Sequence, residues 1–305
     1  MLYRIIKPFI RVALYFFFRK IYLNHSEVYA IKGPVLITAN HPNSFLDAIL
    51  IGAFFKKPIH FLARGDAFKK PIHRFFLGLL NMIPIYRLSE GKENLYLNEY
   101  AFRASKKILE DDGIVLIFIE GICLLTNELQ PFKKGAARIA LDYKGKKPLQ
   151  ILPLGIAYDR FNSWGSTVNL HAGKTISLAE LLPFDDRAKN MRYFNDSIVQ
   201  SLNRLIVTPV NAKPAQNRIV KLIGNLGYII HRWFFLGLDS FVRRKTQNTV
   251  FHDSVLFGTL FILYPILIVI IGFCLISLFG LKMILPLLGI LVMARCIVLV
   301  KNPNE

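Results

Sequence analysis

The segment KGPVLITANHPNSFLDAILIGAFF (residues 32–55) joins a short apolar run to a longer helical one through a polar turn. The run Val35 to Ala39 follows a Gly-Pro turn, and this pattern predicts a buried strand. Asn43 or Ser44 can cap a helix that continues through AILIGAFF. A strand followed directly by a helix is the building unit of α/β folds.

The same alternation continues along the chain. A helical stripe covers 95–113, and further apolar runs of strand length lie at 58–63, 82–86, 113–119 and 149–158. The pattern predicts an α/β domain with a mostly parallel central sheet flanked by helices. In such sheets, functional residues gather at the C-terminal ends of the strands.

The N-terminal segment is basic and aromatic. Only seven residues, VALYFFF, separate Arg11 from Arg19, which is too short to cross a bilayer. We therefore expect an amphipathic helix at the membrane interface within residues 1–28, with its cations turned to an anionic leaflet. An ordinary core helix is the alternative.

The C-terminal segment is strongly apolar. Residues 254–280 contain no charge, and a second run at 283–300 is interrupted by Arg295. About 20 apolar residues suffice to cross the hydrocarbon core, so the pattern predicts a transmembrane helical hairpin. A hairpin buried within protein remains the alternative for the second run. The basic residues on both sides of the hairpin favour a catalytic domain on the cytoplasmic face of the membrane.

These patterns divide the chain into four parts. They are an interface helix (1–28), an α/β core (29–182), a helical amphipathic extension (183–250) and the hairpin (251–300).

The amino-acid composition indicates which classes of molecule the protein binds. Of the 305 residues 53% are hydrophobic, and 39 Lys and Arg against 20 Asp and Glu give a net charge of +19. Cations interleaved with 25 Phe are more typical of membrane surfaces than of nucleic-acid readers, so we expect membrane lipids and no nucleic acid. The three widely spaced cysteines argue against a disulfide framework, and no spacing suggests a metal site.

His41 and Asp47 form the first candidate for chemistry. His41 comes directly after a predicted strand, and Asp47 lies one to two turns along the helix that follows. A carboxylate there can accept from one imidazole nitrogen and leave the other free to take a proton from a substrate hydroxyl. A structural histidine is the alternative.

Three further groups carry charge near predicted strand ends. Glu120 and Gly121 end IFIEG, the pair Lys133 and Lys134 precedes a small-residue helix, and Arg87 follows MIPIY. The cations could hold phosphate. Taken singly, each group also fits a helix cap or a solvated surface charge.

Together and in this order, the four blocks NHPNSFLD, PIYR, FIEG and ILPLGIAY resemble the lysophospholipid/glycerol-3-phosphate acyltransferase superfamily (PlsC-like). The resemblance implies that His41 and Asp47 are the catalytic dyad and that Arg87 contacts the acceptor phosphate. It implies that Glu120 and Gly121 help to bind the acceptor and that Pro153 lies at the acyl-donor side.

The sequence departs from the family pattern at two places. Five residues separate His41 from Asp47 instead of four, which is similar to a subgroup that includes fungal-type glycerol-3-phosphate/dihydroxyacetone-phosphate acyltransferases. Ile122 and Cys123 replace the usual Thr and Arg. Without that Arg, phosphate binding would rest on Arg87, Lys133, Lys134 and Arg64.

We therefore expect an O-acyltransferase of phospholipid biosynthesis. It would move a fatty acyl group from acyl-CoA or acyl carrier protein to glycerol-3-phosphate or 1-acylglycerol-3-phosphate, without a cofactor. Asn43 and Ser44 would line the substrate site, and N–H groups of residues 43–46 would stabilise the oxyanion. Two alternatives remain: acylation of a different lyso-lipid such as an amino-acid lipid, and a non-catalytic lipid-binding membrane protein.

Overall fold

The computed structural model describes residues 2–86, 96–209, 215 and 217–300. Within them, an eight-stranded sheet runs in the order β1-β7-β6-β2-β5-β3-β4, and β8 pairs with β6. The strands are β1 Lys20–Leu23, β2 Val35–Ala39, β3 His60–Arg64, β4 Met82–Ile85, β5 Ile114–Phe118, β6 Gln150–Tyr158, β7 Thr167–Ala172 and β8 Ile176–Ser177. Only β7 and β8 run antiparallel to their neighbour β6. The predicted α/β fold with a mostly parallel sheet is confirmed.

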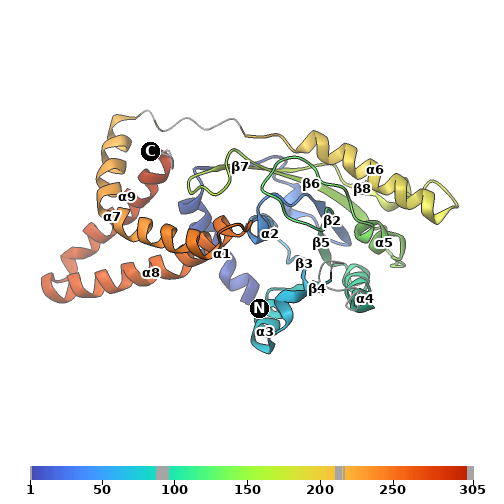
Figure 1. Cartoon of the computed structure of the whole chain (residues 1–305), viewed down its shortest axis with the longest axis horizontal. Coiled ribbons are helices and arrows are strands. Elements are labelled where there is room, and N and C mark those ends of the chain that lie inside the picture. The colour runs from blue at the N-terminus through green and yellow to red at the C-terminus, as the bar shows by residue number, and fades with distance from the viewer. Residues whose placement is uncertain (1, 87–95, 210–214, 216, 301–305) are drawn as a thin grey trace.

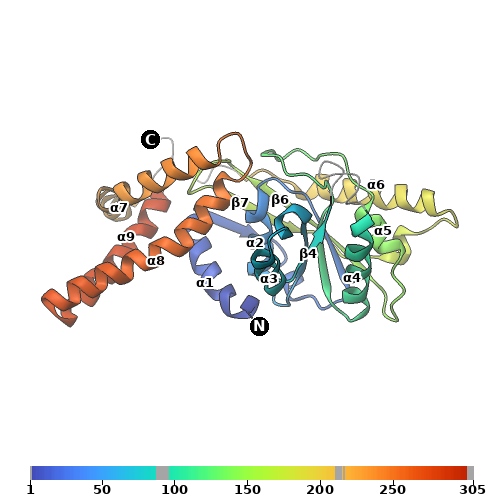
Figure 2. The same cartoon turned by 60° about the horizontal axis from the view of Figure 1, so that its bottom comes forward.

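Helices cover both faces of the sheet (Figures 1 and 2). They are α1 Leu2–Phe17, α2 Ser44–Phe54, α3 Pro71–Leu79, α4 Asn98–Glu110, α5 Gly135–Leu141, α6 Arg187–Leu205, α7 Arg218–Lys245, α8 His252–Phe279 and α9 Ile284–Val300. Short 3₁₀ turns lie at η1 Val28–Ala30, η2 Gly65–Phe68, η5 Leu178–Leu181 and η6 Leu281–Met283.

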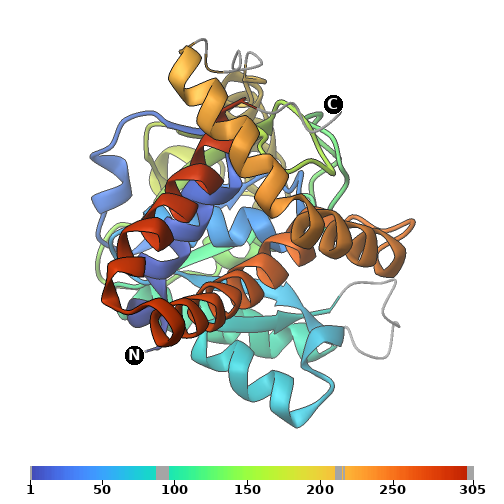
Figure 3. The same cartoon turned by 90° about the vertical axis from the view of Figure 1, so that its left-hand side faces the viewer.

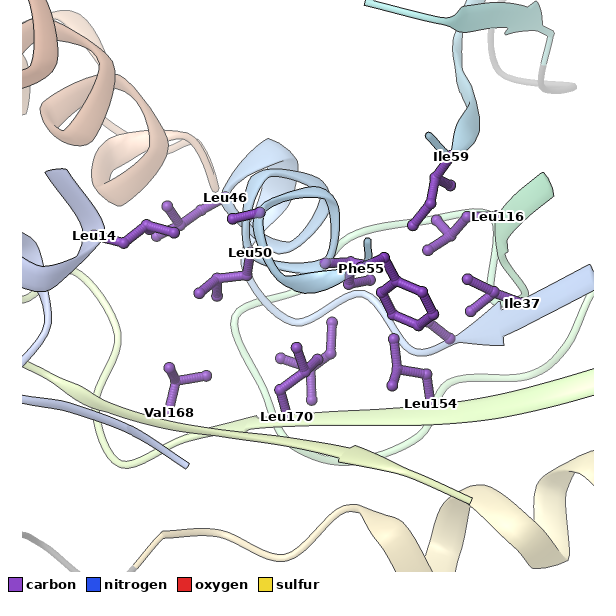
Figure 4. Packing of buried hydrophobic residues seen from close by; sticks show 14 of the residues in the cluster. Leu14, Ile37, Leu46, Leu50, Phe55, Ile59, Leu116, Leu154, Val168 and Leu170 are labelled. Atoms are coloured by element: carbon purple, nitrogen blue, oxygen red, sulfur yellow. The ribbon is translucent and has the colours of Figure 1, made fainter. Parts of the chain in front are cut away.

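Side-chain alternation along the strands divides the core into two layers. On β2, Val35, Ile37 and Ala39 join the layer that includes α1 and α2, whereas Leu36 joins the layer of α4, α5 and α6. Figure 4 shows Leu46 and Leu50 of α2 packed over the sheet in the first layer. Burial of each such leucine contributes about 1.5–3 kcal/mol, which fixes α2 on the sheet.

The structure adds strands that the apolar runs did not predict. In β7, Asn169 and His171 alternate with apolar residues, so no continuous apolar run marks this strand. β1 has only four residues and lies at the sheet edge. These strands extend the sheet beyond β6.

Helix α6 lies within the segment that the sequence analysis grouped with the extension. Its residues Phe194, Ile198 and Leu202 are buried in the layer of α4 and α5. The helix therefore packs on the sheet as part of the α/β body.

Cations of the N-terminal segment bind backbone carbonyls of the protein itself. Arg11 Nε donates to the carbonyl of Ala53 over 2.6 Å, and Lys7 donates to the carbonyl of Phe55. These carbonyls belong to the C-terminal end of α2, where the helix leaves acceptors without intrahelical partners. Arg19 is 6% exposed and donates to Val298 of α9. Three of the cations expected to face a membrane thus bind backbone carbonyls.

Helices α8 and α9 form the C-terminal hairpin, which projects from the α/β body (Figures 1 and 2). The segments His252–Phe279 and Leu281–Val300 are each long and apolar enough to cross a membrane, and within their most apolar stretches few side chains are buried. The hairpin docks on the body at its two ends, where Leu256 and Phe257 of α8 and Cys296, Ile297 and Val298 of α9 are buried. The exposed surface favours the membrane hairpin over the alternative of a hairpin buried in protein.

Arg295, which interrupts the second apolar run, also faces the protein. Its guanidinium donates to the carbonyls of Phe18 over 2.8 Å and Arg19 over 3.0 Å. It also lies 3.9 Å from the centre of the Tyr15 ring. The guanidinium therefore joins the C-terminal part of α9 to the end of α1.

Candidate active site

His41 and Asp47 meet at the C-terminal edge of the sheet. β2 ends at Ala39, and α2 begins at Ser44 with Asp47 in its first turn. His41 Nδ1 lies 2.9 Å from Asp47 Oδ2. The Asp47 side chain is fully buried, whereas that of His41 is 19% exposed. The five intervening residues thus still allow direct contact.

The imidazole of His41 is oriented on two sides. Its ring stacks on Phe118 with 3.8 Å between centroids and 8° between planes. Because a carboxylate can only accept, the proton on the ring belongs on Nδ1, and Nε2 is the basic atom. Nε2 makes no hydrogen bond to any residue that the structure describes. It can accept a proton from an approaching hydroxyl.

Two donors besides His41 bind the carboxylate of Asp47, and the sequence predicted neither of them. Tyr158 Oη donates to Asp47 Oδ1 over 2.7 Å, and the N–H of Asn43 donates to Oδ2 over 2.8 Å. Ala39, the last residue of β2, pairs with Leu154 of β6. β6 continues for four more residues, and its last residue, Tyr158, therefore extends past the C-terminal edge of the sheet beside β2. Burial, and then the charge of Asp47, raises the pKa of Tyr158 well above its ordinary value. Its hydroxyl therefore stays a donor.

Asn127 holds the backbone of Tyr158. Its Oδ1 accepts from the Tyr158 N–H over 3.0 Å, and its Nδ2 donates to the Tyr158 carbonyl over 2.8 Å. The only sequence signal for Tyr158 is that it ends the block ILPLGIAY, and Asn127 has none.

Glu120 supports the backbone at the site. Its carboxylate accepts from the N–H of His41 and from the N–H of Gln130, each over 3.0 Å. Burial raises the pKa of Glu120, although these two N–H groups oppose the shift. Glu120 is 3% exposed. Its carboxylate therefore holds the backbone at His41 and at Gln130 in place. Contact with an acceptor, which the resemblance implies, would have to compete with these bonds.

Gly121 lies beside one of the predicted phosphate-binding lysines. It adopts φ +65°, and a Cβ there would come within 2.9 Å of Lys133 Cγ. Lys133 and Lys134 are both exposed. The helix that follows them, α5, has only seven residues. The structure therefore brings Lys133 next to the FIEG turn.

The predicted phosphate site includes two arginines, Arg64 and Arg87. Arg64 ends β3, and its guanidinium pairs with Asp66, including an Nε to Oδ1 bond of 3.1 Å. It also lies 5.9 Å from the ring centre of Phe251. Arg87 lies outside the described residues. A phosphate at Arg64 would have to share it with Asp66.

The N–H groups at the start of α2 were expected to bind the oxyanion, but three of them are already bonded within the protein. The N–H of Asn43 donates to Asp47, that of Ser44 to Cys123 Sγ over 2.9 Å, and that of Leu46 to Ser254 Oγ over 3.0 Å. The expectation that the N–H groups of residues 43–46 bind the oxyanion is wrong for these three, because each already has an acceptor.

Cys123 is the acceptor for Ser44 and lies near the dyad. Burial, and then the charge of Asp47, raises the pKa of its thiol to about 12. At neutral pH the group is therefore a protonated thiol, which is a poor nucleophile.

Pro153 and a surface hollow lie near residues that support the dyad. Pro153 is buried within β6 and pairs with Thr38, three residues before His41. A hollow of about 540 Å³ is lined by residues 127–132 and by Val199, Asn203 and Ile206. Among the described residues no group of three or more His, Cys, Asp or Glu could hold a metal ion.

Comparisons with known proteins bear on the fold and on the segment that carries the site. Residues 10–157 match the model of the family described as Acyltransferase. Among solved structures, the fold is similar to that of the 1-acyl-sn-glycerophosphate (LPA) acyltransferase PlsC from Thermotoga maritima. The TM-score is 0.50 and the identity 19%, over 68% of this chain and 81% of that chain. No curated protein matches the chain. Residues 10–157, which hold both His41 and Asp47, thus match the Acyltransferase family model, and the α/β fold is similar to that of PlsC.

Proposed function

We propose that this protein is a membrane-bound O-acyltransferase of phospholipid biosynthesis. It transfers a fatty acyl group from acyl-CoA or acyl carrier protein to the hydroxyl of glycerol-3-phosphate or 1-acylglycerol-3-phosphate. The observation that carries the proposal is the contact of 2.9 Å between His41 Nδ1 and Asp47 Oδ2 within the segment that matches the Acyltransferase family model. The five-residue spacing supports its assignment to the subgroup with the longer first block.

The reaction needs a base and a way to return its proton. The acceptor hydroxyl gives its proton to His41 Nε2 as its oxygen bonds to the thioester carbonyl carbon. Asp47 stabilises the imidazolium, as in other His–Asp pairs. The C–S bond then breaks, and the thiol leaves with the proton from Nε2.

Cations near the edge of the sheet would hold the acceptor phosphate. Lys133 is supported by its position against Gly121 of the FIEG turn, and Arg64 by its position at the end of β3. Lys134 and Arg87 complete the proposed set. A fixed phosphate selects the hydroxyl that reaches His41.

A different lyso-lipid acceptor is the second candidate. Two observations favour it: Arg64 already pairs with Asp66, and Cys123, which replaces the usual Arg, is occupied by the N–H of Ser44. An acceptor without phosphate, such as an amino-acid lipid, would not need these cations.

The membrane location follows from the substrates and the hairpin. Acyl chains and the acylated product are lipids, and α8 and α9 are long enough to keep the domain at the bilayer. The basic residues Arg243, Arg244 and Lys245 before α8 support a cytoplasmic position.

The test is an acyl-transfer assay with the full chain in liposomes. Labelled acyl-CoA and acyl carrier protein are each offered with glycerol-3-phosphate, 1-acylglycerol-3-phosphate and a lyso-amino-acid lipid. His41→Ala should lower kcat by about 10²–10⁴-fold, the usual share of general base catalysis. His25→Asn is the control, because His25 is exposed and Asn tolerates its φ of +43°.

Each outcome decides between the candidates. Transfer to a phosphate-bearing acceptor that is lost only in His41→Ala supports the proposal. Transfer only to the lyso-amino-acid lipid supports the second candidate. Normal turnover of His41→Ala would contradict both.

A further inference from the structure

The first turn of α8 contacts the turn that carries the catalytic dyad. Asp253 Oδ2 accepts from Asn43 Nδ2 over 2.9 Å and from the N–H of Asn162 over 2.9 Å. Oδ1 accepts from the N–H of Ser163 over 2.9 Å and lies 3.1 Å from His252 Nδ1. Asp253 is 2% exposed, so these four partners take the place of water around a buried carboxylate.

Ser254 makes a second contact with the same turn. Its Oγ accepts from the N–H of Leu46 over 3.0 Å and lies 3.3 Å from the carbonyl of Asn43. Ser254 is fully buried. Two successive residues of α8 therefore bind residues on both sides of Ser44.

The corner between α7 and α8 is itself braced. His252 Nε2 lies 3.1 Å from Asp239 Oδ1 of α7, and Asp239 Oδ2 accepts from Arg243 over 2.7 Å. Arg243 also donates to the carbonyl of Asn162 over 3.2 Å. The network closes a ring from α7 through α8 to the 161–163 loop, which keeps Asp253 in place.

The turn that receives these bonds needs external support. Ser44 adopts φ +52°, a conformation that costs a non-glycine residue free energy and persists only when neighbours enforce it. Asn43, on its N-terminal side, donates through its own N–H to Asp47. A displaced turn would therefore move Asp47 relative to His41.

We infer that Asp253 and Ser254 are positioning residues for the transfer reaction, holding residues 43–46 so that Asp47 meets His41. The inference rests on the proposed function. The helix that carries both residues is then part of the active site as well as a candidate membrane span.

The test compares Ser254→Ala and Asp253→Asn with a matched control on the same helix. Thr259→Ala removes a hydroxyl that, among the residues the structure describes, bonds only to the Val255 carbonyl of its own helix. Ser254→Ala should lower kcat about tenfold with both KM values nearly unchanged, because a hydrogen bond to a buried N–H is lost. Ser254→Cys should recover part of the loss, since a sulfur already accepts an N–H at Cys123.

A second readout does not depend on turnover. In a Cys274→Ala, Cys296→Ala background, Cys123 is the only cysteine of the chain. Its sulfur is held by the N–H of Ser44, so a loosened turn should raise its labelling rate by a methanethiosulfonate about fivefold or more. Thr259→Ala should leave the rate unchanged.

The two readouts separate failure of the inference from failure of the proposed function. Lower kcat and faster labelling in Ser254→Ala, with melting temperature matching that of Thr259→Ala, support the inference. Values equal to Thr259→Ala in both readouts overturn it, even if Asp253→Asn does not fold. If the wild type transfers no acyl group, the function fails, and the labelling rates still decide whether α8 holds the turn.

Discussion

Asp47 is constrained by three donors from two parts of the chain. His41 Nδ1, the N–H of Asn43 and the hydroxyl of Tyr158 all lie within 2.9 Å of its carboxylate oxygens. A buried carboxylate with such partners can keep one orientation while the imidazole gains a charge. At the scale of single residues, Tyr158 therefore contributes to the dyad as a positioning residue.

Tyr158→Phe should lower kcat about 10- to 100-fold with little change in KM, because a hydrogen bond to a charged group contributes about 1.5–3 kcal/mol. The ring and its packing are retained. Tyr29→Phe is the control, since it removes a buried hydroxyl that donates to the Leu170 carbonyl over 2.7 Å. Steady-state kinetics and melting temperatures measure both variants. Equal losses of kcat would show that Tyr158 acts only on stability.

At the scale of elements, cations in apolar helices bind the ends of other helices. Lys7 and Arg11 of α1 cap the C-terminal end of α2, and Arg295 of α9 caps that of α1. Burial, and then the charge of Arg11, lowers the pKa of Lys7 to about 8. These side chains join α9, α1 and α2 in a series that ends at the helix carrying Asp47.

Arg295→Leu makes α9 more apolar, yet it should destabilise the protein. Three carbonyls at the end of α1 lose their donor, which should cost on the order of 1–3 kcal/mol. Thermal unfolding in detergent measures the change. Val292→Leu, at a position that is 54% exposed, is the control. An unchanged or raised melting temperature for Arg295→Leu would show that the cap contributes nothing.

At the scale of the whole molecule, apolar surface gathers at one end. Helix α7 exposes Ile229, Ile230 and Trp233, and α8 exposes Val269 and Phe273. Figure 3 shows α7, α8 and α9 together on this side of the molecule. The 28 residues of α8 measure about 42 Å, more than the ~30 Å hydrocarbon core. This end therefore has the length and surface to enter a bilayer.

If the hairpin crosses the membrane, its tip and the catalytic domain lie on opposite sides. In a cysteine-free background, Lys282→Cys at the tip and Lys146→Cys on the domain should react with an impermeant maleimide from opposite faces of sealed vesicles. Both lysines are exposed. Labelling of both from the same face would show that the hairpin does not cross.

The sequence alone determined the features that depend on local pattern. Runs of apolar residues predicted β2 to β6, the charge-free run predicted the hairpin, and a His after a strand with an Asp in the next helix predicted the dyad. Such features follow from the intrinsic period and burial of neighbouring residues. The tertiary structure decided which distant groups meet: Tyr158 lies 111 residues from Asp47, and Asp253 lies 210 residues from Asn43. Their contacts depend on the order and register of the strands and on where α8 docks, which no local pattern encodes.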